Sequence, residues 1–123
     1  MIVEDDANQI ELVSYNLENA DQVFETCNAL RPQDALKILR ERRIDCVVSD
    51  LILPGMSGIH LCKAIKDFLS VPFILYTGRE SDEVADLSCV DDYVHKEPNL
   101  IHYAILAKKI RDAVEKNRKL EKS

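Results

Sequence analysis

Residues 46–58 read Cys46-Val-Val-Ser-Asp50-Leu-Ile-Leu-Pro54-Gly-Met56-Ser-Gly58, and the rest of the chain can be interpreted from them. A short apolar run that ends in a carboxylate is typical of a buried parallel strand delivering one charged side chain to the carboxyl edge of a sheet. Pro54 favours an extended Leu53, and the glycines let the backbone fold back before a helix begins near Ser57. We therefore expect Asp50 at an exposed mouth, where open α/β sheets bind ligands, although a strand-end Asp can also simply cap a turn.

Short apolar runs alternate with amphipathic stretches along the whole chain. Strands are predicted at residues 1–3, 22–26, 44–49, 71–76 and 92–95. Helices are predicted at 7–18, from Pro32 through Leu39, at 57–68 and from 99 to beyond Arg118, with a weaker one at 79–87. Such alternation indicates the α/β class, with a doubly wound parallel sheet covered on both faces. Right-handed crossovers favour the flavodoxin-like strand order 2-1-3-4-5.

The composition indicates one ordinary globular domain. The 123 residues are 46% hydrophobic and 31% charged, which is enough to build a sizeable core. The net charge of −6 argues against a nucleic-acid-binding surface. No apolar run reaches the length of a membrane span, and no signal peptide is recognisable. We therefore expect a cytoplasmic protein that contacts neither nucleic acid nor membrane directly.

The cysteines and histidines do not indicate a metal site. Cys27, Cys46, Cys62 and Cys89 contain no C-x-x-C pair, and the three histidines share no ligand spacing. We expect reduced cysteines, several of them packed as small hydrophobic side chains.

The predicted strand ends bring a distinctive set of polar residues to one edge of the sheet. These are Glu4 and Asp5 after the first strand, Asp50 after the third, Thr77 after the fourth and Lys96 after the fifth. Three carboxylates in one pocket require a cation, and oxygen ligands favour a hard ion such as Mg²⁺. A carboxylate can attack phosphorus, and a metal, a hydroxyl and an ammonium can stabilise the transferred group. The set therefore predicts a phosphoryl-accepting aspartate.

At this point the sequence resembles a response-regulator receiver domain over the chain up to about Val114. The resemblance is carried by Glu4-Asp5, by Asp50 with Pro54 to Gly58, by Thr77-Gly78, and by Tyr93-Val-His-Lys96. Each of these motifs is weak alone, but all occur in the right order at predicted strand ends.

The resemblance implies a role for each matching residue. Asp50 would be the phosphoacceptor, and Asp5 and Asp50 would ligate Mg²⁺, with Glu4 acting directly or through water and the backbone carbonyl of Ile52 completing the protein ligands. Thr77 would be the switch hydroxyl, Lys96 the phosphoryl-binding cation and Tyr93 the switch aromatic. The alternatives are a capping hydroxyl for Thr77, a core side chain for Tyr93 and a solvated strand-end lysine for Lys96.

The resemblance also implies a function. It would be a two-component signalling switch that is not an enzyme in the ordinary sense. It would accept phosphate from a histidine kinase or phosphotransfer domain and act on a downstream domain or partner. The alternative is a pseudo-receiver, a protein-interaction module that keeps the fold without the chemistry. An aspartyl phosphatase is more remote, because Ile52 stands where a second Asp would be needed.

One feature of the loop after Lys96 departs from the family pattern, and the last helix suggests how the chain continues. Glu97 stands between Lys96 and Pro98, which leaves open whether this loop keeps the family's cis peptide bond. The last helix carries a stripe of Leu106, Ile110, Ala113, Asn117 and Leu120, typical of a narrow helix-pairing seam. We expect residues 1–114 to form the receiver body, 115–123 to extend the helix towards a further domain, and the fragment to be a monomer or a weak homodimer.

Overall fold

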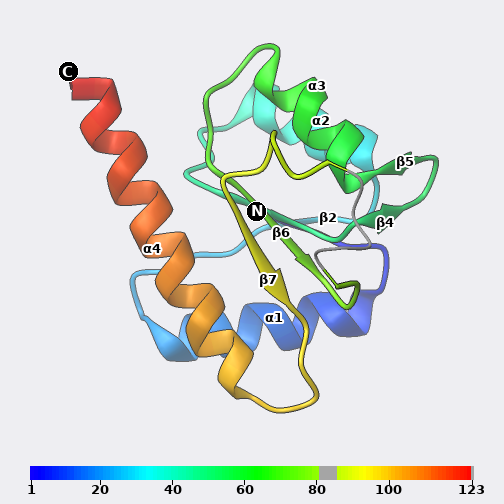
Figure 1. Ribbon diagram of the computed structural model, residues 1–123, viewed down its shortest axis with the longest axis vertical. Coiled ribbons are helices and arrows are strands. Elements are labelled where there is room, and N and C mark those ends of the chain that lie inside the picture. The colour runs from blue at the N-terminus through cyan, green and yellow to red at the C-terminus, as the bar shows by residue number, and fades with distance from the viewer. Residues whose placement is uncertain (81–85, 123) are drawn as a thin grey trace.

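The computed structural model describes residues 1–80 and 86–122, and a parallel sheet lies at its centre (Figure 1). Its strands lie in the order β2-β1-β3-β6-β7, and every neighbouring pair is parallel. Their bounds are Ile2–Val3 (β1), Asn28–Ala29 (β2), Val47–Ser49 (β3), Phe73–Thr77 (β6) and Asp92–His95 (β7). Counted along the chain, this is the predicted order 2-1-3-4-5, so the predicted fold class is confirmed.

Helices cover both faces of the sheet (Figure 1). They are α1 (Ala7–Ala20), α2 (Pro32–Glu41), α3 (Gly58–Lys66) and α4 (Ile101–Lys122). Strand β6 contributes side chains to the hydrophobic core on each face of the sheet. Phe73 and Leu75 pack beneath α2 and α3. Ile74 and Tyr76 pack beneath α1 and α4 on the other face. Alternate residues of a strand point to opposite faces, so a strand buried on both faces reads as an unbroken apolar run.

The strand predicted at residues 22–26 is wrong. Helix α1 continues to Ala20, and Asp21 then begins a turn. The Asp21 side chain accepts a hydrogen bond from the Val23 N–H at 3.0 Å, and the Asp21 carbonyl accepts one from the Phe24 N–H at 3.1 Å. Val23 is 85% exposed, so its apolar character marks no buried strand. The pairing with β1 begins later, where the Ile2 N–H donates to the Cys27 carbonyl.

The loop after Asp50 contains a small antiparallel hairpin that the sequence analysis did not predict. Strand β4 (Ile52–Leu53) pairs with β5 (Met56–Ser57), and the turn between them uses Gly55 at φ +76°. Few residues other than glycine adopt this left-handed conformation. Ser57 then caps α3, its hydroxyl accepting from the His60 N–H at 3.2 Å.

The weak helix predicted at 79–87 falls largely on residues 81–85, which lie outside the described residues. The flanking positions that are described, 79–80 and 86–87, are not helical. Within the described ranges the backbone contains no cis peptide bond, so the Lys96-Glu97-Pro98 loop is trans throughout. None of the helices described combines the length and the apolar character needed to cross a bilayer.

Most of the apolar stripe of α4 belongs to the domain's own core. Leu106 and Ile110 are buried against the sheet and α1, and Ala113 packs beside them, whereas Leu120 is 64% exposed. The predicted pairing seam is therefore used within the chain along most of its length. Only its last positions reach the surface.

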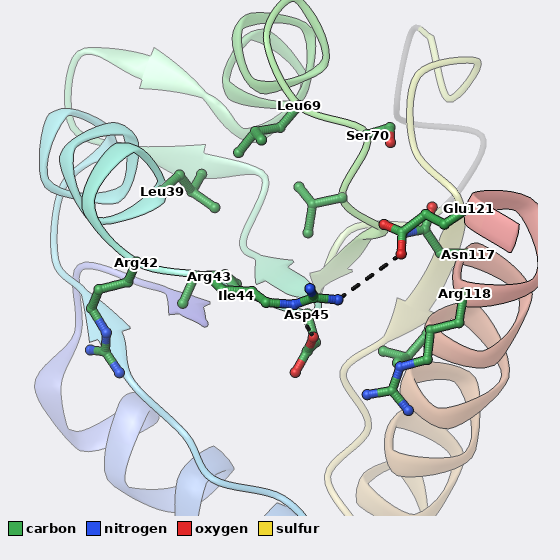
Figure 2. A pocket seen from close by; sticks show the side chains of 12 residues that line it. Leu39, Arg42, Arg43, Ile44, Asp45, Leu69, Ser70, Asn117, Arg118 and Glu121 are labelled. Atoms are coloured by element: carbon green, nitrogen blue, oxygen red, sulfur yellow. Dashed lines mark hydrogen bonds and ion pairs between the residues drawn. The ribbon is translucent and has the colours of Figure 1, made fainter.

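The end of α4 lines a pocket at the amino-terminal edge of the sheet, opposite Asp50 (Figure 2). The pocket has a volume of about 220 Å³, and Glu121 faces Arg43 across it at 4.0 Å. Both side chains are more than half exposed, and an exposed ion pair of this kind contributes little to stability. The boundary at residues 114 and 115 stays a prediction.

Candidate functional site

The parallel strands place the predicted polar residues at one edge of the sheet. Asp50 follows β3, and its N–H donates to the Val3 carbonyl of β1 at 3.1 Å, which brings Asp50 beside Glu4. Lys96 follows β7, and its N–H donates to the Thr77 carbonyl at the end of β6 at 2.8 Å. The backbone ladder alone therefore positions these side chains.

Lys96 is the centre of the cluster. Its Nζ lies 3.1 Å from Glu4 Oε2, 3.7 Å from Asp50 Oδ2 and 5.1 Å from the centre of the Tyr76 ring. The Lys96 side chain is only 21% exposed. One ammonium thus lies close to two carboxylates above an aromatic face, so Lys96 is not a solvated strand-end lysine.

Glu4 is the most deeply buried charged group of the site, at 7% exposure. Burial is the main cause that raises the pKa of the Glu4 carboxyl; the nearby Lys96 charge opposes this shift, and the negative charge of Asp50 adds to it. The Asp6 N–H adds a hydrogen bond of 3.3 Å to Glu4 Oε1. The buried Glu4 carboxyl therefore holds its proton more strongly than an exposed glutamate does, despite the positive charge of Lys96.

The stability of the metal-free protein should depend on pH through Glu4. The folded-state pKa lies above the unfolded value of 4.5, so the folded state holds this proton at higher pH than the unfolded state does. The contribution of this proton to folding stability is fully present below the unfolded-state pKa, and it is lost as pH rises through the folded-state pKa. We expect the unfolding free energy of the wild type, minus that of Glu4→Gln, to fall as pH rises from about 4 to 7.

Urea titrations in chelator-containing buffer at several pH values measure this difference. A difference that stays constant or rises with pH would contradict the assignment.

Asp50 combines a fixed orientation with access from outside. Its Oδ1 accepts from the Leu51 N–H at 2.8 Å, while Oδ2 faces the Lys96 ammonium. The side chain is 18% exposed, so a small molecule can reach it. A carboxylate held in this way beside a cation is suited to react with an electrophile that carries negative charge.

The predicted metal ligands are only partly assembled. Glu4 and Asp50 share Lys96, whereas Asp5 lies exposed on the surface. Ile52, whose carbonyl was the fourth predicted ligand, is 56% exposed on β4. Across the described parts of the chain, no three carboxylate, thiol or imidazole side chains are gathered as a ready metal cluster. The assignment of metal ligands stays a prediction.

Thr77 and Tyr93 converge on one backbone segment. Thr77 is 2% exposed, and its Oγ1 accepts from the Arg79 N–H at 3.3 Å. The half-buried Tyr93 donates its phenol hydrogen to the Arg79 carbonyl. The two predicted switch residues therefore contact the same residue from two strands.

His95 is a member of this region that the sequence analysis missed. Its Nε2 lies 3.0 Å from the Gly78 carbonyl, and its Nδ1 lies 2.8 Å from Glu97 Oε1. The hydrogen bond with Glu97 is the main cause that raises the pKa of His95. Glu97, the residue that departs from the family pattern, thus connects the loop after Lys96 to the end of β6. In the sequence, His95 could be recognised only as the last residue of an alternating strand. Such alternation does not indicate which residues a side chain will contact.

The sequence matches a known protein family and is similar to individual proteins. Residues 1–105 match the family described as the response regulator receiver domain. Over 99 residues the chain is 35% identical to the heme response regulator HssR of Staphylococcus saprophyticus and 37% identical to the transcriptional regulatory protein AfsQ1 of Streptomyces coelicolor. Each alignment covers 78% of this chain and 43% of the relative. The chain therefore matches less than half the length of these curated relatives.

Solved structures agree with this match. The response regulator TrrA from Thermotoga maritima, solved in complex with Mg(2+)-BeF, is 30% identical and superposes with a TM-score of 0.75 over 89% of this chain and 95% of that one. The signal receiver domain of a signal transduction histidine kinase from Syntrophus aciditrophicus is 29% identical, with a TM-score of 0.77 over 93% of this chain and 87% of that one.

Proposed function

The chain belongs to the response regulator receiver domain family, and on this premise we propose that Asp50 accepts a phosphoryl group in a two-component phosphorelay. The observation that carries the proposal is the placement of a reachable Asp50 carboxylate beside the Lys96 ammonium. In the transfer, an Asp50 carboxylate oxygen forms the new bond to phosphorus, and the bond between phosphorus and the donor breaks. The donor would be a histidine kinase or a phosphotransfer domain.

The neighbouring residues can stabilise the added charge. Lys96 is close enough to pair with phosphoryl oxygens as well as with Glu4. The buried Thr77 hydroxyl, which accepts from Arg79, still has its own proton to donate. Movement of Thr77 towards a phosphoryl oxygen would disturb the Arg79 backbone that Tyr93 also contacts, and so would pass the change to the surface.

The donor set fits Mg²⁺. Glu4, Asp5, Asp50 and the Ile52 carbonyl offer only oxygen atoms, and the Glu4 and Asp50 carboxylates share the single ammonium of Lys96. Bound Mg²⁺ would supply positive charge for the oxygens of the phosphoryl group. Glu4 and Asp50 share Lys96, so a metal held by these two carboxylates would lie in the same pocket as the phosphoryl group.

The experiment that tests the function is intact-mass measurement after incubation with acetyl phosphate. We expect the addition of one phosphoryl group in Mg²⁺ and none in excess chelator. Hydroxylamine should remove the group, because it cleaves an acyl phosphate and leaves a phosphoserine or phosphothreonine intact. A chain that takes up no phosphate under any of these conditions would instead act as a pseudo-receiver.

Magnesium should also stabilise the fold. At ten times its dissociation constant, a ligand that binds only the folded state adds about 1.4 kcal/mol, which raises the melting temperature by roughly 5 °C in a domain of this size. We expect Asp5→Asn to abolish most of this shift in a thermal melt. Asp6→Asn is the matched control, because Asn replaces Asp well at the helix cap that Asp6 forms with Asn8. Equal shifts in the two variants would count against Asp5 as a ligand.

A further inference from the structure

Two cysteines that are far apart in sequence meet beside α3. Cys62 lies on α3 and is fully buried, and Cys89 lies in the turn before β7 and is partly exposed. Their Sγ atoms are 2.7 Å apart, and both are free thiols. A disulfide bond needs about 2.05 Å between sulfur atoms, so a shift of well under an ångström would bring them to bonding distance.

The surrounding contacts hold this meeting point in place. Asp91, two residues after Cys89, accepts from Lys66 Nζ of α3 at 2.7 Å and from the Phe73 N–H of β6 at 2.7 Å. Asp86, three residues before Cys89, lies 3.5 Å from Lys63 Nζ of α3. The segment that carries Cys89 is thus tied to α3 on both sides of the cysteine. These contacts bring the backbone that carries Cys89 close to α3.

We propose that Cys62 and Cys89 form an intramolecular disulfide bond when the protein meets a small-molecule disulfide. The other two cysteines lack this arrangement, because Cys46 is buried with its thiol directed to the Val47 carbonyl at 3.8 Å. Cys27 lies directly before β2, which is the outer strand on the side of the sheet away from β7 and Cys89. The proposal does not depend on phosphorylation of Asp50.

The reaction proceeds by two exchange steps. The partly exposed Cys89, as its thiolate, attacks one sulfur of the small disulfide, which breaks the S–S bond and releases the first small thiol. Cys62 then attacks Cys89 Sγ, forms the internal bond and releases the second small thiol. The two protons of the protein thiols end on the two released thiols. The protein sulfurs are oxidised by two electrons, and the small disulfide is reduced by the same two.

Burial determines which cysteine plays which part. It is the first cause that raises the pKa of the Cys62 thiol, so Cys62 is a poor first nucleophile and needs Cys89 to be activated beside it. The same burial makes Cys62 a poor leaving group when a reductant attacks Cys89. The bond should therefore be slow to reduce in the folded protein.

The bond would join α3 to the segment before β7 and close a loop that contains all of β6 with Thr77. The loop spans 27 positions, and a cross-link of that length restricts the unfolded chain. We expect oxidation to raise the melting temperature by about 5–10 °C.

The test incubates the full chain with oxidised glutathione, alkylates the remaining thiols after unfolding and maps the peptides without reduction. Cleavage by trypsin and by an Asp-directed protease separates Cys62 from Cys46, because Asp50 lies between them. We expect a monomer that has lost two hydrogen atoms, a peptide pair linked through Cys62 and Cys89, and a higher melting temperature.

Cys89→Ser should lose both the linked pair and the stabilisation, and Cys27→Ser is the matched control that should keep both. Cys62→Ser would place a hydroxyl at a fully buried position and disturb the fold, so Cys89→Ser carries the comparison. A stable glutathione adduct on Cys89 with Cys62 still alkylated, or a linked pair involving Cys27 or Cys46, would overturn the proposal.

Discussion

Asp50→Asn protein is expected to take up no phosphate from acetyl phosphate and Mg²⁺ under conditions that label the wild type with one phosphoryl group. The Asn side chain keeps the size of Asp and can still accept from the Leu51 N–H, so the fold should be preserved. It lacks the anionic oxygen that attacks phosphorus, so the loss should be complete. Intact-mass measurement over a time course gives the result directly.

Asp45→Asn is the matched control for this experiment. Asp45 lies before β3, at the amino-terminal ends of the strands and so away from Asp50. Its side chain is about half exposed, and its Oδ1 lies 3.5 Å from Arg43 Nε. The same chemical change at that position should leave labelling unaltered. Equal labelling of Asp50→Asn and wild type would assign the phosphate to another residue, and peptide mapping would then identify it.

The second large effect is expected on stability, from Gly58→Ala. A Cβ at Gly58 would lie 2.2 Å from the Asp50 carbonyl oxygen and 3.2 Å from Leu51 Cα. Both neighbours are backbone atoms, and the Gly58 N–H already donates to the Leu51 carbonyl at 2.6 Å, so neither side can move without breaking the start of α3. We expect a loss of roughly 3 kcal/mol or more in urea unfolding, near the upper end of what overpacking costs.

The other glycines serve as controls for the cause of this loss. Gly78→Ala meets no atom within 4 Å and should change stability by about 0.5 kcal/mol or less. Gly55→Ala is also uncrowded but has a left-handed φ of +76°, so a cost of roughly 1 kcal/mol is expected from the backbone alone. If Gly58→Ala were no worse than Gly55→Ala, the contact with Asp50 would not be the reason for glycine at position 58.

The sequence was most informative where a strand is buried on both faces. The apolar runs before Asp50 and Thr77 gave β3 and β6, and with them the position of the site, because a side chain directly after such a strand must emerge at the carboxyl edge. The prediction failed at β2, which is only two residues long. The apolar residues before it, including the exposed Val23, belong to a turn.

Contacts between side chains were beyond what the sequence could predict. The pairing of His95 with Glu97 and the meeting of Cys62 with Cys89 depend on how loops settle against finished elements. No spacing rule connects residues 27 positions apart. The same limit applies to Asp5, which a sequence motif places beside Glu4 but which is exposed in the folded chain.

The two outer strands of the sheet, β2 and β7, affect whether the protein aggregates at high concentration. At one edge, β2 is too short to act as a template for a strand from another molecule. At the other, β7 begins with Asp92, which pairs with Lys109 of α4 at 2.9 Å, and it ends with the partly exposed His95. Charged groups along an edge strand oppose the addition of an apolar strand. A domain built on an open parallel sheet is thereby protected against edge-to-edge aggregation at both of its borders.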